Sequence, residues 1–286
     1  MFNLICLTKT YNLNDMQAWL AYHSTFVDKI YLLDNDSVVD IKQVAKQYSN
    51  VEYKQIHGFA DQWHLFADIL NQKTDIKFNE EDFVCFLDDD EYLYYDLKQN
   101  FNEVVNNQFK SMLDCVMLPE ILMSTIKYQK KRDKVLPEFS TYRRPDLSSQ
   151  GKAIICWRSY SKYSYTLQDT EKGHVPWING LRYSDVVGSG VSKTTYGLTQ
   201  PDIENQPIAL IHYHVKSTDD WNMKIKRGSA ANPSTESRQN GSYEDDIHKN
   251  IKFDGYKILD LTMKNTYTRT MKTVTVLNDM TFQRSL

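Results

Sequence analysis

The sequence predicts an α/β protein with a mostly parallel central sheet flanked by helices. Over the first ninety residues, short apolar segments alternate with segments of helical periodicity. Alternation of this kind is typical of parallel strands joined by right-handed helical crossovers. The composition agrees, because 41% apolar and 25% charged residues are ordinary values for a globular protein.

The elements of the first half follow from their apolar patterns. Apolar residues at positions i, i+3, i+4 and i+7 predict a helix over Gln62–Leu70. They are Trp63, Phe66, Ala67 and Leu70. Short apolar runs predict strands, and 3.6-residue periodicity predicts two more helices. The expected strands are 2–7, 29–34, Val51–Ile56 and 82–87, and the other helices are 15–26 and 41–48.

The second half is less regular. We expect strands at 114–118 and 153–157, a basic loop at 127–134, and a helix at 219–231 that ends before Asn232-Pro233. Residues 234–242 are expected to form a loop, and the last forty residues have no clear period. We therefore divide the chain into a catalytic domain at 1–230 and an extension at 231–286. The catalytic domain has a nucleotide-binding half at 1–100 and an acceptor half at 101–230.

Charge and composition exclude several classes of protein. The formal net charge is −3, so a large basic face for nucleic acid is not expected. No stretch reaches the roughly 18 apolar residues that span a bilayer, and the apolar N-terminus lacks the basic start of a signal peptide. We expect a cytoplasmic protein without a transmembrane segment. The four cysteines lie in apolar runs without CxxC pairs, which favours buried thiols over zinc or disulfides.

A run of four carboxylates follows the fourth expected strand. Asp88, Asp89, Asp90 and Glu91 come directly after Phe86-Leu87. If the chain stays extended, Asp88 and Asp90 share one face. Two adjacent carboxylates repel, and a divalent cation such as Mg²⁺ or Mn²⁺ relieves that repulsion. The alternative is a solvated acidic turn.

Polar residues also follow the second expected strand, as Asp34-Asn35-Asp36-Ser37. In a doubly wound sheet this position often holds the base or ribose of a nucleotide. The alternative is an Asx-type turn, in which Asp and Asn bond the nearby backbone.

Three segments together resemble the family 92-type glycosyltransferases. The first is 9–37, which contains Trp19, Tyr22-His23 and the run from Ile30 to Ser37. The second is 86–93, which contains a DxDE pattern. The third is 212–228, which contains His212, Lys216, Trp221 and Gly228. The resemblance implies the A-type glycosyltransferase (Rossmann-like) fold, a nucleotide-sugar donor and a Mn²⁺ or Mg²⁺ ion. The family's early Glu is missing after Lys9, and the segment 124–149 matches weakly.

The resemblance also implies roles for individual residues. The metal ligands would be Asp88, Asp90 and His212, with His214 in reserve because it lies two residues along the same strand. Lys224 and Arg227, at i and i+3, would share a helix face near the leaving diphosphate. The complete donor-binding set is Thr8, Lys9, Asp34, Asn35, Ser37, Gln62, Asp88, Asp89, Lys216, Lys224 and Arg227.

The function implied is metal-dependent transfer of a sugar, typically a hexose, from a UDP-sugar to a glycan or glycolipid. We expect inversion at the sugar and a setting in bacterial surface polysaccharide or lipo-oligosaccharide synthesis, with peripheral association at the inner membrane as an option. Inversion needs a carboxylate base for the acceptor hydroxyl. Asp169, Glu171 and Glu120 are the candidates.

Three other functions remain as alternatives. An aspartyl phosphatase shares the Asp-x-Asp pattern but wants Thr or Val where this chain has Tyr92. A nucleotidyltransferase has a similar sheet and metal carboxylates, but it favours a Gly-rich loop after the first strand. Here that loop reads Leu7-Thr8-Lys9-Thr10. A non-catalytic protein that binds nucleotide-sugars would retain the same binding residues.

Overall fold

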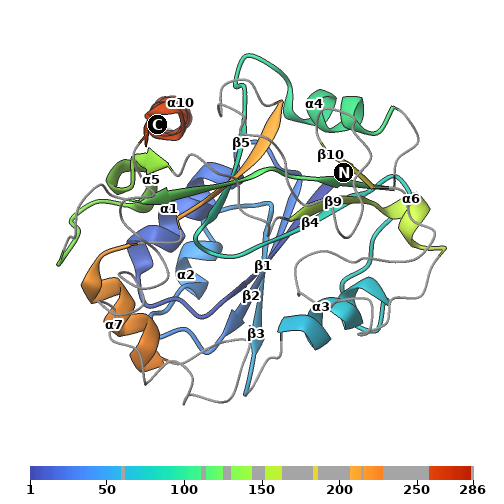
Figure 1. Cartoon of the computed structure of the whole chain (residues 1–286), viewed down its shortest axis with the longest axis horizontal. Helices are drawn as coiled ribbons and strands as arrows, with labels where there is room; N and C mark the ends of the chain where they lie inside the picture. The colour runs from blue at the N-terminus through green and yellow to red at the C-terminus, as the bar shows by residue number, and fades with distance from the viewer. Residues whose placement is uncertain are drawn as a thin grey trace.

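The computed structural model describes residues 1–58, 62–110, 114–124, 130–143, 152–162, 183–185, 207–213, 216–227 and 258–284. These residues form a mixed α/β structure with a mostly parallel main sheet and flanking helices (Figure 1). The predicted fold class is therefore confirmed.

The main sheet has seven strands in the order β10-β6-β9-β4-β1-β2-β3. The three pairs β3–β2, β2–β1 and β1–β4 are parallel, as the alternation predicts. Strand β9 is antiparallel to both β4 and β6. The bounds are β1 Phe2–Thr8, β2 Lys29–Asn35, β3 Val51–Ile56, β4 Phe83–Leu87, β6 Cys115–Met117, β9 Ala153–Cys156 and β10 Tyr183–Asp185.

Both faces of this sheet are buried, because alternate residues of β1 enter different cores. Leu4 and Cys6 belong to the core beneath helices α1 (Leu13–His23) and α2 (Lys42–Ala45). Ile5 and Leu7 belong to the core beneath α3 (Gln62–Leu70) and α6 (Trp157–Tyr160). Helices on both faces explain why the strands read as continuous apolar runs.

A second sheet has the order β12-β8-β7-β11-β5. Its strands are β5 Glu91–Tyr95, β7 Glu120–Ser124, β8 Tyr142–Arg143, β11 Ile208–His212 and β12 Ile258–Leu259. Strand β5 lies at the edge of this sheet, and three residues separate its start from the end of β4. Asp88, Asp89 and Asp90 therefore form the connection between the two sheets, and Glu91 is the first residue of β5.

Helix α1 covers the free edge of β5 with side chains. The Trp19 indole donates a 2.7 Å hydrogen bond to the Glu91 carbonyl, and the Tyr22 hydroxyl donates one of 2.8 Å to the Leu93 carbonyl. The Leu93 N–H donates to Nε2 of His23 at 3.2 Å. An exposed strand edge leaves polar backbone groups unpaired, so these contacts fix β5, and the connection before it, to the main body.

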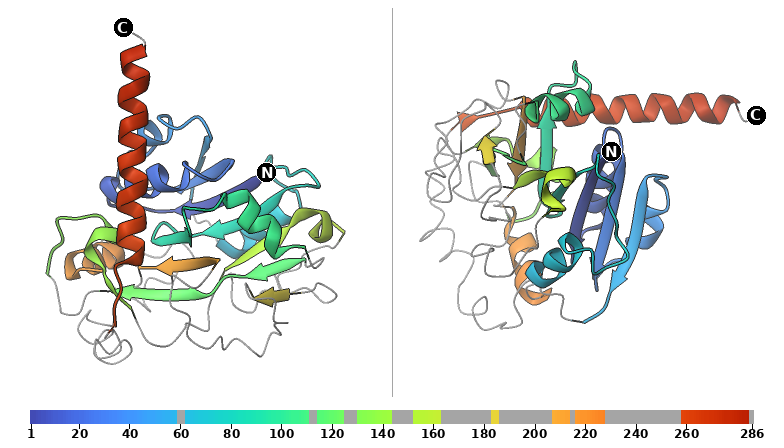
Figure 2. Two further views of the ribbon diagram at one scale, coloured as in Figure 1. Left: turned by 90° about the horizontal axis from the view of Figure 1, so that it is seen from above. Right: turned by 90° about the vertical axis from the view of Figure 1, so that its right-hand side faces the viewer.

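The remaining helices are α4 Phe101–Gln108, α5 Leu136–Phe139, α7 Thr218–Arg227 and α10 Thr262–Arg284. Helix α10 runs alongside α5 and α1 and then extends beyond the rest of the described chain (Figure 2). The sequence showed no clear hydrophobic period in this segment, so the helix was not predicted. No helix in the described ranges is long and apolar enough to cross a bilayer.

Other expectations are refined by the structure. The bounds expected for β3 and α3 are correct, and α7 is observed at Thr218–Arg227 where a helix at 219–231 was expected. The extended geometry expected through Asp90 is wrong, because residues 89 and 90 form a turn. Cys6, Cys85 and Cys115 are buried and all four thiols are free, as expected. The predicted loop at 234–242 lies outside the described residues.

Candidate functional site

The turn after β4 sends its carboxylates in different directions. Asp88 accepts a hydrogen bond from Gln62 at 2.8 Å and pairs with the Lys152 ammonium at 3.2 Å. Lys152 also lies 3.2 Å from Glu91, whose carboxylate accepts the Asp88 N–H at 2.8 Å. Asp89 accepts a 2.6 Å bond from the Thr8 hydroxyl at the end of β1.

Asp90 faces the second sheet instead. One of its oxygens, Oδ2, lies 2.9 Å from the Lys216 ammonium. The other, Oδ1, lies 3.7 Å from Nε2 of His212, and the Asp90 carbonyl accepts the Tyr213 N–H at 2.9 Å. Asp88 and Asp90 therefore do not share one environment, because the turn separates them.

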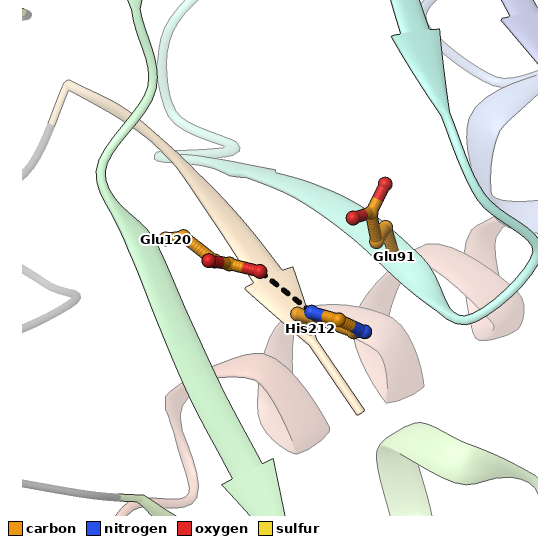
Figure 3. Close-up of side chains that lie close together, drawn as sticks. All are labelled: Glu91, Glu120 and His212. Atoms are coloured by element: carbon orange, nitrogen blue, oxygen red, sulfur yellow. Dashed lines mark hydrogen bonds and ion pairs between the residues drawn. The ribbon is translucent and has the colours of Figure 1, made fainter. Parts of the chain in front are cut away.

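Glu91, Glu120 and His212 gather on one face of the second sheet, where each offers a ligand atom within 4.8 Å of the others (Figure 3). In the register, His212 is opposite Glu91 across the β5–β11 pair, and Glu120 is opposite Leu210 across the β7–β11 pair. The His212 Nδ1 lies 2.6 Å from Oε1 of Glu120. Three segments far apart in sequence thus meet in one polar cluster.

Burial and neighbouring charges shift the pKa values of this cluster. Burial raises the pKa of Glu91 to about 8, although Lys152 opposes this shift. Burial alone would lower the pKa of His212, but Glu120 and Asp90 outweigh it and raise the pKa to about 9. Burial would raise the pKa of Asp90, but Lys216 and His212 hold it well below its usual value. Asp90 is therefore ionised between Lys216 and His212, whereas burial favours the neutral form of Glu91 near pH 7.

The ends of β1, β2 and β3 form a cradle beside this cluster. Buried Asp34 accepts the Ser37 N–H and the Tyr53 hydroxyl, both at 2.8 Å. Asn35 donates to the Gly58 carbonyl at 2.8 Å, and the Ser37 hydroxyl accepts the Thr10 N–H at 3.0 Å. The turn that we left as an alternative for Asp34 is thus present, and it ties three strand ends together.

Arg132 fixes helix α7 next to the site. Its guanidinium, 5% exposed, bonds Asp220 at 2.6 Å and Asp15 at 2.7 Å. Asp220 in turn accepts the N–H and the hydroxyl of Ser217, at 3.1 and 2.6 Å. Because Ser217 follows Lys216, this network holds the backbone that presents Lys216 to Asp90.

The structure thus brings together many of the predicted site residues. The hydrogen bonds and ion pairs described above join seven of them: Thr8, Gln62, Asp88, Asp89, Asp90, His212 and Lys216. The positive charge of Lys224 also helps to lower the pKa of Asp90. Lys9 is in the loop after β1, and its charge reaches Asp36 in the strand-end cradle. Asp169, Glu171 and His214 lie outside the described residues, as does the Arg227 side chain. Their roles stay predictions.

Sequence reasoning missed two residues of the site. Lys152 is a buried ion-pair partner of two carboxylates, and Arg132 was treated only as part of a basic loop. The available signal for Lys152 was its position directly before the apolar run Ala153–Cys156, which places it next to a buried strand. A lysine is rarely buried unless it is paired, so that position indicates a carboxylate partner.

A divalent cation could be held between His212 and Asp90, next to this cluster. The separation of 3.7 Å between His212 Nε2 and Asp90 Oδ1 is too long for a hydrogen bond. The two atoms are close enough for both to contact one ion at metal–ligand distances of about 2.1 Å. Mixed imidazole and carboxylate ligands suit Mn²⁺ better than Mg²⁺.

Comparisons with known proteins give no family membership. No family model and no curated protein matches the chain. Among solved structures, a 4-diphosphocytidyl-2C-methyl-D-erythritol synthase matches with 10% identity, covering 70% of this chain and 92% of that one, at a TM-score of 0.36. The synthase from Anaerococcus prevotii DSM 20548 matches with 13% identity, 71% and 94% coverage, and a TM-score of 0.34. HddC from Yersinia pseudotuberculosis matches with 11% identity, 65% and 89% coverage, and a TM-score of 0.37.

These findings contradict the identification of the chain as a family 92-type glycosyltransferase, and with it the sugar-transfer function. No family model matches, and the solved structures named above are titled as 4-diphosphocytidyl-2C-methyl-D-erythritol synthases and HddC, not as glycosyltransferases. The physical reason is that the short motifs describe features common to many α/β sheets. A buried strand that ends in carboxylates, together with a His on a strand of another sheet, does not define which group is transferred.

Proposed function

We propose that the chain is a divalent-cation-dependent nucleotidyltransferase. It would transfer a nucleoside monophosphate from a nucleoside triphosphate to a phosphorylated acceptor and release pyrophosphate. The observation that carries this proposal is the Asp90 environment, with His212 Nε2 at 3.7 Å and the Lys216 ammonium at 2.9 Å. It lies just beyond the carboxyl end of β4, and ligands bind beyond the strand ends in open α/β sheets.

The chemistry needs positive charge more than it needs a base. An acceptor phosphate oxygen attacks the α-phosphorus, a new P–O bond forms, and the bond to the bridging oxygen breaks as pyrophosphate takes the electron pair. Lys216 and Lys224 would stabilise the charge that develops on the phosphate oxygens. An acceptor phosphate is already an anion, so no carboxylate has to remove a proton.

A bound divalent cation would act as a Lewis acid on the phosphate oxygens, with Asp90 and His212 as the residues that hold it. The nucleoside would lie over the cradle formed by Asp34, Asn35 and Ser37. The hydrogen bonds within this cradle fix the shape of the cradle. The loop after β1 has no glycine, but Thr8 anchors it to Asp89. Side-chain cations therefore take the place of a glycine-rich phosphate loop in this proposal.

The direct test measures pyrophosphate release with each of the four nucleoside triphosphates, Mg²⁺ or Mn²⁺, and a panel of sugar phosphates and polyol phosphates. We expect release that requires nucleotide, acceptor and cation together. Asp90→Asn should reduce the rate by about 100-fold or more, the usual scale for a lost electrostatic contact at the reacting group. Asp68→Asn is the matched control, because Asp68 is half-exposed and pairs only loosely with Lys73 at 3.8 Å.

The outcomes separate the proposal from its alternatives. No pyrophosphate release and no thermal stabilisation by any nucleotide would refute it. Stabilisation by a nucleotide and Mn²⁺ without turnover would instead favour a non-catalytic nucleotide-binding protein.

A further inference from the structure

We propose that Glu120 is a positioning residue for His212, and not the proton-accepting base for which it was one of three candidates from the sequence. Its carboxylate would fix the imidazole so that Nε2 faces Asp90 and can serve as a cation ligand. This inference rests on the proposed function in one respect, because it takes a divalent cation as the ligand of this site.

The first argument is the register of three strands. Strand β11 pairs with β7 on one side and β5 on the other. Glu91 is directly opposite His212 on β5, whereas on β7 Glu120 is opposite Leu210, two residues from His212 and on the same face of the sheet. In Figure 3 the Glu120 carboxylate extends toward the imidazole, and the dashed line marks their bond. The contact is therefore a diagonal one between neighbouring strands, and Glu120 is held in place on a regular strand.

The second argument is which nitrogen is engaged. Nδ1 lies 2.6 Å from Oε1 of Glu120, a short distance typical of a charge-assisted hydrogen bond in which the imidazole donates. Nε2 is thereby directed toward Asp90, 3.7 Å away. Metal-bound histidines commonly donate their other ring N–H to a carboxylate, which fixes the tautomer and strengthens the ligand. Glu120, His212 and Asp90 have that arrangement.

The third argument is the burial of Glu120. The residue is 5% exposed, and its second oxygen, Oε2, is buried without a hydrogen-bond partner in the part of the chain that the structure describes. A base must reach the proton that it removes, whereas Oε1 is engaged by His212 and Oε2 is enclosed. A buried carboxylate that holds an imidazole is suited to orientation.

The test is a Mn²⁺ titration of the full chain, in which electron paramagnetic resonance measures the free ion. We expect Glu120→Gln, which keeps the side-chain shape, to raise the Kd for Mn²⁺ by about 10- to 100-fold. His212→Ala should raise it at least as much. Because Glu120 acts through His212, adding Glu120→Gln to His212→Ala should change the Kd by less than about twofold. Glu103→Gln, on the exposed face of α4, is the matched control.

Turnover at saturating Mn²⁺ gives a second readout. A positioning role predicts that excess Mn²⁺ restores most of the activity of Glu120→Gln, whereas a base role predicts a loss that Mn²⁺ does not restore. The inference is overturned if Glu120→Gln leaves the Kd unchanged, or if it raises the Kd by the same factor with and without His212. If wild type binds no Mn²⁺, the cation site itself fails. If wild type binds Mn²⁺ but releases no pyrophosphate, only the proposed function fails, and the Kd values still decide the role of Glu120.

Discussion

Acid should destabilise this protein through His23, the last residue of α1. His23 is fully buried against the rings of Trp19 and Tyr92. Its Nδ1 donates to the Trp19 carbonyl at 3.0 Å, and its Nε2 accepts the Leu93 N–H at 3.2 Å. Protonation of Nε2 would remove that acceptor and bury a positive charge. Burial accordingly lowers the pKa of His23 to about 3.

The size and sign of the effect follow from this shift. The unfolded chain binds a proton near pH 6.5, whereas the folded chain resists it until about pH 3. Between these values the unfolded state holds more protons, so stability falls as the pH falls. The slope is about 1.4 kcal/mol per pH unit. That slope is reached only below pH 6.5, because the unfolded-state group is half protonated there, so from pH 7 to pH 4.5 His23 alone should remove about 2.5 kcal/mol from the free energy of unfolding.

Urea unfolding at pH 7, 5.5 and 4.5, followed by tryptophan fluorescence, measures this loss. Other carboxyl groups titrate in the same range, so the comparison is with His23→Gln, whose side-chain amide oxygen can still accept the Leu93 N–H. The variant should be less stable at pH 7 but should lose about 2.5 kcal/mol less than wild type between pH 7 and 4.5. Equal losses in the two proteins would refute the assignment of acid sensitivity to His23.

Three further predictions concern groups around the site. Arg132→Ala leaves the buried carboxylates of Asp15 and Asp220 without their counter-ion and should cost about 3–5 kcal/mol of stability; an unchanged melting temperature would show that the network is not stabilising. Lys152→Met should destabilise the cation-free protein by a similar amount. Mn²⁺ should restore part of the lost stability in a thermal melt if a cation can replace the missing charge, and Lys162→Met, at an exposed position, is the control. Trp19→Phe removes the hydrogen bond from the indole to the Glu91 carbonyl and should lower the free energy of unfolding by about 2–3 kcal/mol. It should also weaken Mn²⁺ binding, because that bond holds the turn before β5 in place, and wild-type Mn²⁺ affinity in a folded Trp19→Phe protein would contradict this coupling.

Much of the first half of the fold could be predicted from local sequence. The parallel order of β3, β2, β1 and β4 follows from alternating apolar runs and helical segments. The bounds of Val51–Ile56 and Gln62–Leu70 follow from residue type and spacing alone. The strand-end positions of Thr8, Asp34 and Asp88 follow in the same way, because parallel strands deliver their carboxyl ends to one edge.

Helix α10 shows where local patterns fail. Its Thr-rich sequence has a weak apolar period, and its buried residues Met263 and Tyr267 become an apolar face only against the core beside α1. Tyr267 packs on Tyr22, with ring centroids 6.2 Å apart. Tertiary packing stabilises most helices in proteins more than intrinsic propensity does, so this helix depends on a surface that the local sequence does not contain.

The sequence by itself thus determined the fold class and which strand ends would carry polar groups. The tertiary structure decided which of these groups face one another. Lys152 is 64 residues from Asp88, and His212 is 92 residues from Glu120, so neither pair leaves a local pattern. Their contacts are set by β9 inserted antiparallel beside β4 and by β7 paired with β11. Sheet pairing brings distant side chains within hydrogen-bonding distance, and that proximity is what turns isolated charges into a site.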